Sequence, residues 1–259
     1  MKCRKPILGI TCLAALLGSS SLSFSQEIGC GALPTHAQLQ AALKAATGTP
    51  PAGNGGFNLH MWATVVNRDG VVCGVAFTGT ERGDQWPGSR VISAQKANTA
   101  NAFSLSGLAL STANLFTAVQ PGGSLFGLQH SNPVDTENAY AGPSANYGTA
   151  NDPLVTKKSG GVNVFGGGLA LYNGAGQLLG GLGVSGDRSC ADHSIAWKTR
   201  HTLGLNHVPA GVSATGDDNI VYADHSNSPK KNALFNAWGH AECSAAATGN
   251  ALPTSYPIP

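Results

Sequence analysis

The sequence predicts an α+β fold, a five-stranded antiparallel sheet with helices on both faces. Two hairpin patterns, at 61–79 and 161–186, predict antiparallel strands, because a short turn joins only antiparallel neighbours. Segments with helical spacing of apolar residues precede, separate and follow the hairpins. A fifth strand completes the sheet, at a position that the pattern does not give. The chain has 259 residues and is 42% hydrophobic, which suits the core of one ordinary domain.

The first hairpin is the strongest local signal. β-branched residues flank Asp69-Gly70 in "MWATVVNRDGVVCGVAFTG". Glycine tolerates the positive φ that such turns need. The second hairpin turns across Gly-Ala-Gly at 174–176, between "GVNVFGGGLALYN" and "QLLGGLGVSG".

Four segments have helical spacing: 36–48, 90–105, 109–120 and 189–205. The stretch 121–160 is so long a loop that it is either functional or an excursion across the surface, and we expect an insertion at about 130–160. The pattern weakens after Val208. We therefore expect a domain at 26–207 and a C-terminal extension, 208–259, packed on it.

The first 25 residues are typical of a secretory signal peptide. A basic start precedes an apolar run of 11 residues, 7–17, and small residues then predict cleavage after Ser25. The run is shorter than the ~20 residues that span a bilayer, and we expect no membrane span elsewhere. The alternative is a buried N-terminal helix. We expect a periplasmic or secreted protein.

Four cysteines follow this leader: Cys30, Cys73, Cys190 and Cys243. An even number in an exported chain predicts two disulfides, with three possible pairings. We favour Cys30–Cys73 and Cys190–Cys243, although the sequence does not fix the choice. The absence of a Cys-x-x-Cys pair argues against a zinc site.

The charge of the chain argues against a nucleic-acid partner. Removal of the leader takes three of the 15 Lys and Arg and none of the 13 Asp and Glu, which leaves 12 basic and 13 acidic residues and a formal charge of −1. Proteins that bind phosphate backbones carry clustered positive charge instead.

The stretch "GGLGVSGDRSCADHSIAW", 180–197, joins a glycine-rich strand to a helix. Its turn, 183–187, places free N–H groups at a helix start, where a phosphate or carboxylate can bind. The other interpretation is structural: Asp187 or Ser189 caps the helix, and the glycines let strand and helix pack closely. The sequence leaves both open.

Cations and histidines on two predicted helices are further candidates. Lys96 and Thr99 lie on one helical stripe and, with Arg90, would hold an anionic ligand; the alternative is that the cations are solvated. His193 lies within ~40° of a tryptophan on its helix and would ligate a metal or haem iron, unless it is a hydrogen-bonded structural residue. His130, at the start of the long loop, is the other candidate ligand.

Catalytic patterns are absent from the sequence. It contains no His-Glu-x-x-His, EF-hand loop or Gly-x-Ser-x-Gly elbow. Glu81, Asp84, Asp187 and Asp192 are carboxylates that nothing pairs for acid–base chemistry. The sequence therefore favours a protein that is not an enzyme.

Three segments together resemble the GlcG/HbpS-like haem-binding family, also called the haem-degrading domain family. They are "VVNRDGVVCGVAFTG", "SRVISAQKANTANAF" and "GGLALYNGAGQLLGGLGVSGD". The family's AVVD-x-x-G hairpin, A-x-x-KA-x-TA helix and GVSG turn correspond to residues 65–70, 94–100 and 179–186. The resemblance covers about 36–205. The run after GVSG and the four cysteines depart from it, as in a secreted branch with disulfides.

The resemblance implies a GlcG-like, profilin-like α/β/α sandwich, a haem or related tetrapyrrole cofactor and a homo-oligomer. The pocket would lie between the 90–103 helix and the 183–197 turn. Its expected cofactor contacts are Arg90, Lys96, Thr99, His130, Gly186 and His193, with His193 or His130 as the iron ligand.

We expect an exported haem-binding protein that is not catalytic and that handles or senses haem or iron. The alternative is an accessory subunit or enzyme that binds a small organic acid in the same pocket. A third possibility is a structural oligomer without a ligand. Soret absorbance separates the first from the other two.

Overall fold

The computed structural model describes residues 29–48, 54–222, 237–244 and 251–259. The predicted signal peptide lies outside these residues. Within them, no helix is both long and apolar enough to cross a membrane.

The main sheet has four antiparallel strands in the order β2-β1-β4-β3. Their bounds are β1 Trp62–Asn67, β2 Val72–Phe77, β3 Gly168–Tyr172 and β4 Leu178–Ser185. β1 and β2 form the first predicted hairpin, and β3 and β4 form the second. The turn glycines Gly70 and Gly176 have φ of 75° and 71°, so both adopt the positive φ that glycine tolerates best.

The prediction of a fifth strand in this sheet is wrong for the described residues, because irregular chain occupies both outer edges. Beside β2, the Val72 N–H donates to the Lys157 carbonyl at 2.8 Å. Beside β3, the Tyr172 N–H donates to the Leu205 carbonyl at 2.9 Å. A separate parallel pair, β5 Val221–Tyr222 and β6 Gly239–His240, lies outside the main sheet.

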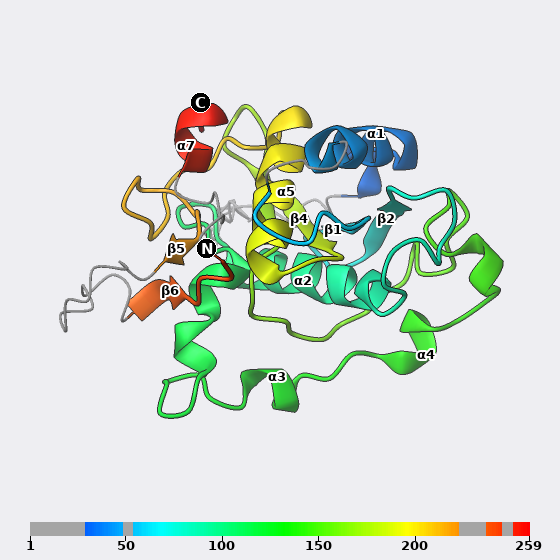
Figure 1. Ribbon diagram of the computed structural model, residues 1–259, viewed down its shortest axis with the longest axis horizontal. Helices are drawn as coiled ribbons and strands as arrows, with labels where there is room; N and C mark the ends of the chain where they lie inside the picture. Colours follow the sequence, from blue (N-terminus) through cyan, green and yellow to red (C-terminus); the bar gives the residue numbers. More distant parts are fainter. Residues whose placement is uncertain (1–28, 49–53, 223–236, 245–250) are drawn as a thin grey trace, which may run out of the picture.

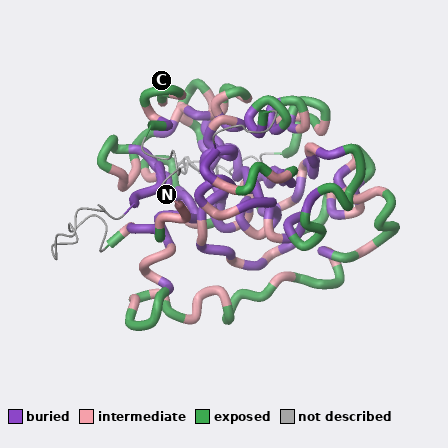
Figure 2. The backbone as a smooth tube through the Cα atoms, in the orientation of Figure 1, coloured by how far each residue is buried: buried purple, intermediate pink, exposed green. Residues whose placement is uncertain are grey.

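Helices cover both faces of the sheet and confirm the α/β/α sandwich (Figure 1). α2 (Ser89–Phe103) packs across β1, β4 and β3 on one face. α1 (His36–Thr47) and α5 (Ser189–Thr202) pack together on the other. Figure 2 shows that these central elements are the most buried part of the chain.

The glycines of β4 allow α2 to lie directly on the sheet. A Cβ on Gly183 would lie 1.9 Å from the Ser93 carbonyl oxygen, and one on Gly181 would lie 2.3 Å from that of Ala97. Any larger residue would push the helix away. Close strand–helix packing is therefore one reason for the glycine-rich stretch.

The expected helix at 109–120 is wrong, because the chain forms two short 3-10 helices there, Thr112–Leu115 and Thr117–Val119. The Asn114 side chain accepts a hydrogen bond from the Ser111 N–H at 2.9 Å and donates to the Asn219 carbonyl at 3.0 Å. Such side-chain bonds to backbone compete with a regular α-helix.

The stretch predicted to be a long loop, 121–160, crosses the surface; we call it the insertion, after the insertion that the sequence predicts within it at about 130–160. It carries the short helices α3 (Leu128–Ser131) and α4 (Thr136–Ala139) and a 3-10 turn, Ser144–Asn146. Figure 1 shows it running along the outer side of the molecule as far as the loop that follows β2.

The two disulfides join Cys30 to Cys73 and Cys190 to Cys243, the pairing that we favoured. The first links the N-terminal 3-10 turn Cys30–Ala32 to β2. The second links the first turn of α5 to the chain after β6. The last helix is α7 (Leu252–Ser255). The backbone carbonyl of Tyr256, which follows it, accepts a hydrogen bond from the Trp197 indole N–H at 2.9 Å.

Candidate functional site

Lys96 fills the interior between α2 and the glycine turn. Its Nζ lies 2.7 Å from Asp192 Oδ2 and 3.1 Å from the Val184 carbonyl oxygen, and it lies over the Phe165 ring at 4.9 Å. The Lys96 side chain is fully buried. The structure therefore places a filled interior where we expected an open pocket.

Burial and pairing act in opposite directions on this ion pair. Burial lowers the pKa of Lys96 and raises the pKa of Asp192 to about 6, while the attraction between the two opposes both shifts. Asp192 also accepts the Asp187 N–H at 2.9 Å. Lys96 therefore has an internal partner, and its charge is not free for an external anion.

Arg90, at the first turn of α2, holds the insertion against the body. Its guanidinium forms two hydrogen bonds to Asp152, one of them from Nε at 2.8 Å, and a third to the Ala139 carbonyl at 2.7 Å. The Tyr147 ring stacks on the guanidinium at 3.8 Å. Arg90 is 2% exposed, so it is a structural clamp and not a surface cation.

Thr99 is also used internally. Its hydroxyl donates to the Gln95 carbonyl at 2.7 Å and accepts the Asn163 N–H at 3.0 Å. It therefore ties the chain before β3 to α2.

The two predicted iron ligands lie in different environments. His193 is fully buried on α5, where its Nε2 accepts the Ile220 N–H at 3.1 Å. Burial, helped by the nearby charges of His240 and Arg200, lowers its pKa to about 3 and keeps the ring neutral. His130 lies exposed on α3, in the insertion. The structure does not bring them together.

The glycine turn is closed by groups of the chain itself. Asp187 accepts the N–H groups of Phe57 at 2.8 Å and Leu59 at 3.2 Å. A Cβ on Gly186 would lie 2.6 Å from the His60 carbonyl oxygen. The Cys190 N–H, in the first turn of α5, points to the Cys243 sulfur at 3.1 Å. The geometry fits the structural interpretation of this turn.

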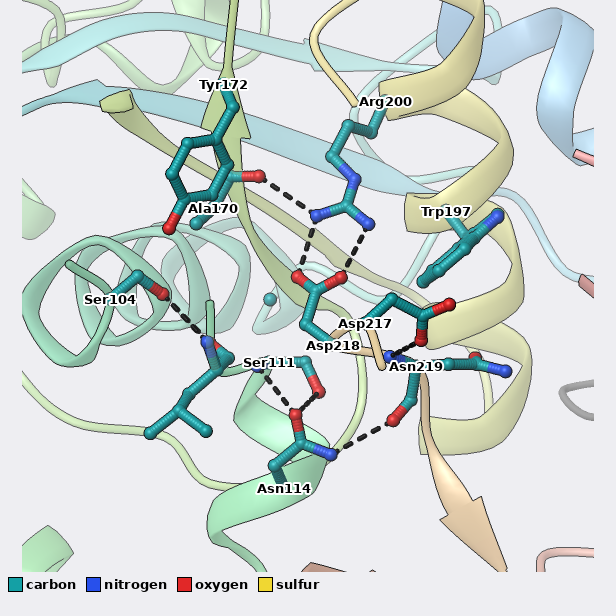
Figure 3. Close-up of polar contacts among 12 residues, drawn as sticks. Ser104, Ser111, Asn114, Ala170, Tyr172, Trp197, Arg200, Asp217, Asp218 and Asn219 are labelled. Atoms are coloured by element: carbon teal, nitrogen blue, oxygen red, sulfur yellow. Dashed lines mark hydrogen bonds and ion pairs between the residues drawn. The ribbon is translucent and has the colours of Figure 1, made fainter. Parts of the chain in front are cut away.

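A third buried ion pair escaped the sequence analysis (Figure 3). Arg200 donates to both Asp218 oxygens at 2.7 Å and to the Ala170 carbonyl at 3.0 Å. Both charged side chains are fully buried. One sign of this pair is present in the sequence, because Arg200 lies on the same helical stripe as His193 and Trp197. Its partner, Asp218, lies in the weakly patterned segment after Val208, where no pattern marked it.

An apolar pocket lies instead beside the start of α2, between the loop after β2 and the insertion. Its volume is about 460 Å³, and it is more apolar than two other cavities of the described chain. Its lining residues are Trp62, Glu81, Arg82, Gly83, Pro87, Gly88, Tyr140, Ser144 and Tyr147. We call it the aromatic pocket. The sequence analysis missed it because its two walls are loops distant in sequence.

The described residues give no support for a metal site built from several protein ligands. They contain no group of three or more His, Cys, Asp or Glu side chains that could hold a metal ion. This leaves open a ligand that brings its own metal.

The observed architecture is an antiparallel α/β/α sandwich with a closed interior and a lateral aromatic pocket. A family model described as "Haem degrading protein HbpS-like" matches residues 35–200. The chain belongs to this HbpS-like family, which confirms the resemblance.

The solved structures that match this chain have low sequence identity to it and TM-scores below 0.5. The PduOC:heme complex is 23% identical, with a TM-score of 0.45, over 67% of this chain and 96% of that one. Klebsiella pneumoniae protein ORFY is 24% identical, with a TM-score of 0.43, over 66% and 90%. A double mutant of Streptomyces reticuli HbpS is 17% identical, with a TM-score of 0.44, over 76% and 99%. No curated protein matches the chain.

Proposed function

We propose that the protein binds haem or a related tetrapyrrole outside the cytoplasm, without catalysing a reaction on it, and serves to handle or sense haem or iron. Family membership supplies the ligand class. The observation that carries the proposal is the aromatic pocket, because a preformed apolar cavity with a few polar groups at its rim is the usual form of a cofactor site.

Haem requires apolar walls for its ring, a cation for a propionate and a protein ligand for its iron. Pro87, Tyr140 and Tyr147 supply apolar surface in front of the buried Trp62, and Arg82 supplies the cation. Tyr140 supplies a phenol, and tyrosine is an established haem ligand. The residues that line the pocket therefore fit haem. When bound, haem would supply the iron.

The interior around Lys96 fits haem poorly. Lys96, Arg90 and Thr99 each have internal partners. His193 is fully enclosed, and burial opposes its protonation. Because these acid–base groups are engaged and enclosed, the geometry favours binding over catalysis.

Export is supported by the two disulfides, since stable disulfides are typical of oxidising compartments. The signal-peptide pattern of the first 25 residues agrees with this. We also propose a homo-oligomer, by analogy with the family. Light scattering on the purified protein tests it, and a mass of one chain would contradict it.

The function is tested by titrating the chain from Gln26, produced in an oxidising compartment, with hemin while the Soret band is recorded. A saturable, shifted band supports haem binding. An unsaturable response equal to that of a protein without a haem site contradicts it. Titration with small hydroxy acids, followed by tryptophan fluorescence, then tests the organic-acid alternative.

A further inference from the structure

We infer that the tetrapyrrole binds in the aromatic pocket, with Tyr140 as the iron ligand and Arg82 paired with a propionate. The inference rests on the proposed function and adds the site, the ligand and the role of the insertion. It moves the site away from Lys96 and His193.

The inner wall of the pocket is rigid. Trp62 is 1% exposed, and its indole N–H donates to the Trp86 carbonyl at 3.0 Å. Its ring meets the Phe77 ring edge-on, with centroids 5.3 Å apart. A wall fixed in this way loses little conformational entropy when a ligand enters the pocket in front of it.

The outer wall belongs to the insertion, which rests directly on these rings. A Cβ on Gly148 would lie 2.2 Å from Phe77 Cδ1 and 2.6 Å from Trp62 Cζ3. The Gly148 N–H donates to Asp152, the partner of Arg90, at 2.6 Å. Because a buried ion pair fixes this backbone, the pocket exists before any ligand arrives.

The two tyrosines of the pocket differ in availability. The Tyr147 hydroxyl donates to the Tyr140 carbonyl at 2.9 Å, and its ring covers Arg90. Tyr140 is 58% exposed, and the interaction with Tyr147 uses its backbone and not its phenol. Tyr140 is therefore the phenol that a metal centre in the pocket can use.

Two charges of opposite sign line the rim, and they provide a matched test. Arg82 and Glu81 are neighbours in the loop after β2, and both are exposed. An anionic propionate would be attracted by Arg82 and repelled by Glu81. A neutral flat ligand would respond to neither.

The experiment is a hemin titration of the wild-type chain and of Tyr140→Phe, Arg82→Ala, Glu81→Gln and His130→Ala, with circular dichroism to check folding. We expect Tyr140→Phe to remove the absorption band of phenolate-bound iron and to weaken binding about tenfold, or ~1.4 kcal/mol. Arg82→Ala should weaken binding by a similar factor while the phenolate band remains. Glu81→Gln should bind as tightly or more tightly, and His130→Ala should be unchanged.

Two failures have different meanings. If the wild-type chain does not bind hemin, the proposed function falls and the inference falls with it. If the wild-type chain binds hemin, and its affinity and spectrum are unchanged in Tyr140→Phe and Arg82→Ala, the proposed function stands and the inference is wrong.

Discussion

Lys96 Nζ lies 2.7 Å from Asp192 Oδ2, and both side chains are buried between α2 and α5. The pair joins helices on opposite faces of the sheet at the end of β4, where Lys96 also donates to the Val184 carbonyl. It therefore holds together the layers of the sandwich, where the sequence suggested an anion site.

The first prediction concerns this pair. Lys96→Met leaves the Asp192 carboxylate buried without its cation, and we expect a loss of about 3–5 kcal/mol in the free energy of unfolding. The double variant Lys96→Met/Asp192→Leu should recover much of the loss, since no charge remains buried. Urea denaturation measures both. Equal stability of wild type and Lys96→Met would contradict the structural role.

The second prediction concerns the clamp on the insertion. Arg90→Met leaves Asp152 buried and unpaired, so we expect about 3–5 kcal/mol of destabilisation and faster proteolysis within 121–160. Hemin affinity should also fall, because the outer wall of the aromatic pocket loses its support. Arg90→Lys keeps the charge but loses the bidentate contact with Asp152, so its stability should lie between those of wild type and Arg90→Met. Unchanged proteolysis in Arg90→Met would show that other contacts hold the insertion.

The third prediction concerns pH. Burial lowers the pKa of His193 to about 3 and that of His240 to about 4. The unfolded chain, with histidine pKa values near ~6.5, binds these protons first, so stability is full above about pH 6.5 and falls as the pH drops toward 4. Each histidine contributes a slope of ~1.4 kcal/mol per pH unit.

The slope is best measured as a difference between variants. Asp192 titrates in the same window with the opposite sign, because its pKa is raised to about 6. Urea denaturation from pH 5 to 7 should show a flatter profile for His193→Gln than for wild type. The exposed His130→Gln should keep the wild-type slope. Parallel profiles for wild type and His193→Gln would contradict the buried neutral state of His193.

The fourth prediction concerns the disulfide between Cys190 and Cys243, which are 53 residues apart. Loop-closure entropy gives ~4 kcal/mol for a loop of this length, and we expect Cys190→Ser/Cys243→Ser to lose 2–4 kcal/mol. Thermal unfolding checks this against the matched pair Cys30→Ser/Cys73→Ser, which opens a loop of 43 residues. A double variant as stable as wild type would show that noncovalent contacts suffice.

Local elements could be predicted because their signals are local. Asp69-Gly70 marks one turn and Gly176 another, each glycine with positive φ. The helix that begins at His36 and ends before Gly48 was also predicted, and Thr35 caps it through a side-chain bond with Gln38. Such elements depend on residues within a few positions of one another.

The site could not be predicted in the same way, because its contacts are distant in sequence. Arg90 and Asp152 are 62 residues apart, and Lys96 and Asp192 are 96 apart. A lysine among small residues has the same pattern whether it faces solvent, a ligand or a buried carboxylate. The aromatic pocket needs both the loop after β2 and the insertion, and neither segment has a periodic pattern of apolar residues in its sequence.

Both disulfides share one arrangement: each joins a cysteine within the family-matched segment 35–200 to one outside it. Reduction would remove the covalent links to the flanking segments and leave no crosslink within the matched domain. Conversely, one protease cut between Cys190 and Cys243 would leave two pieces that migrate together on a non-reducing gel and separate only after reduction. Nicked protein could thus pass unnoticed through a purification.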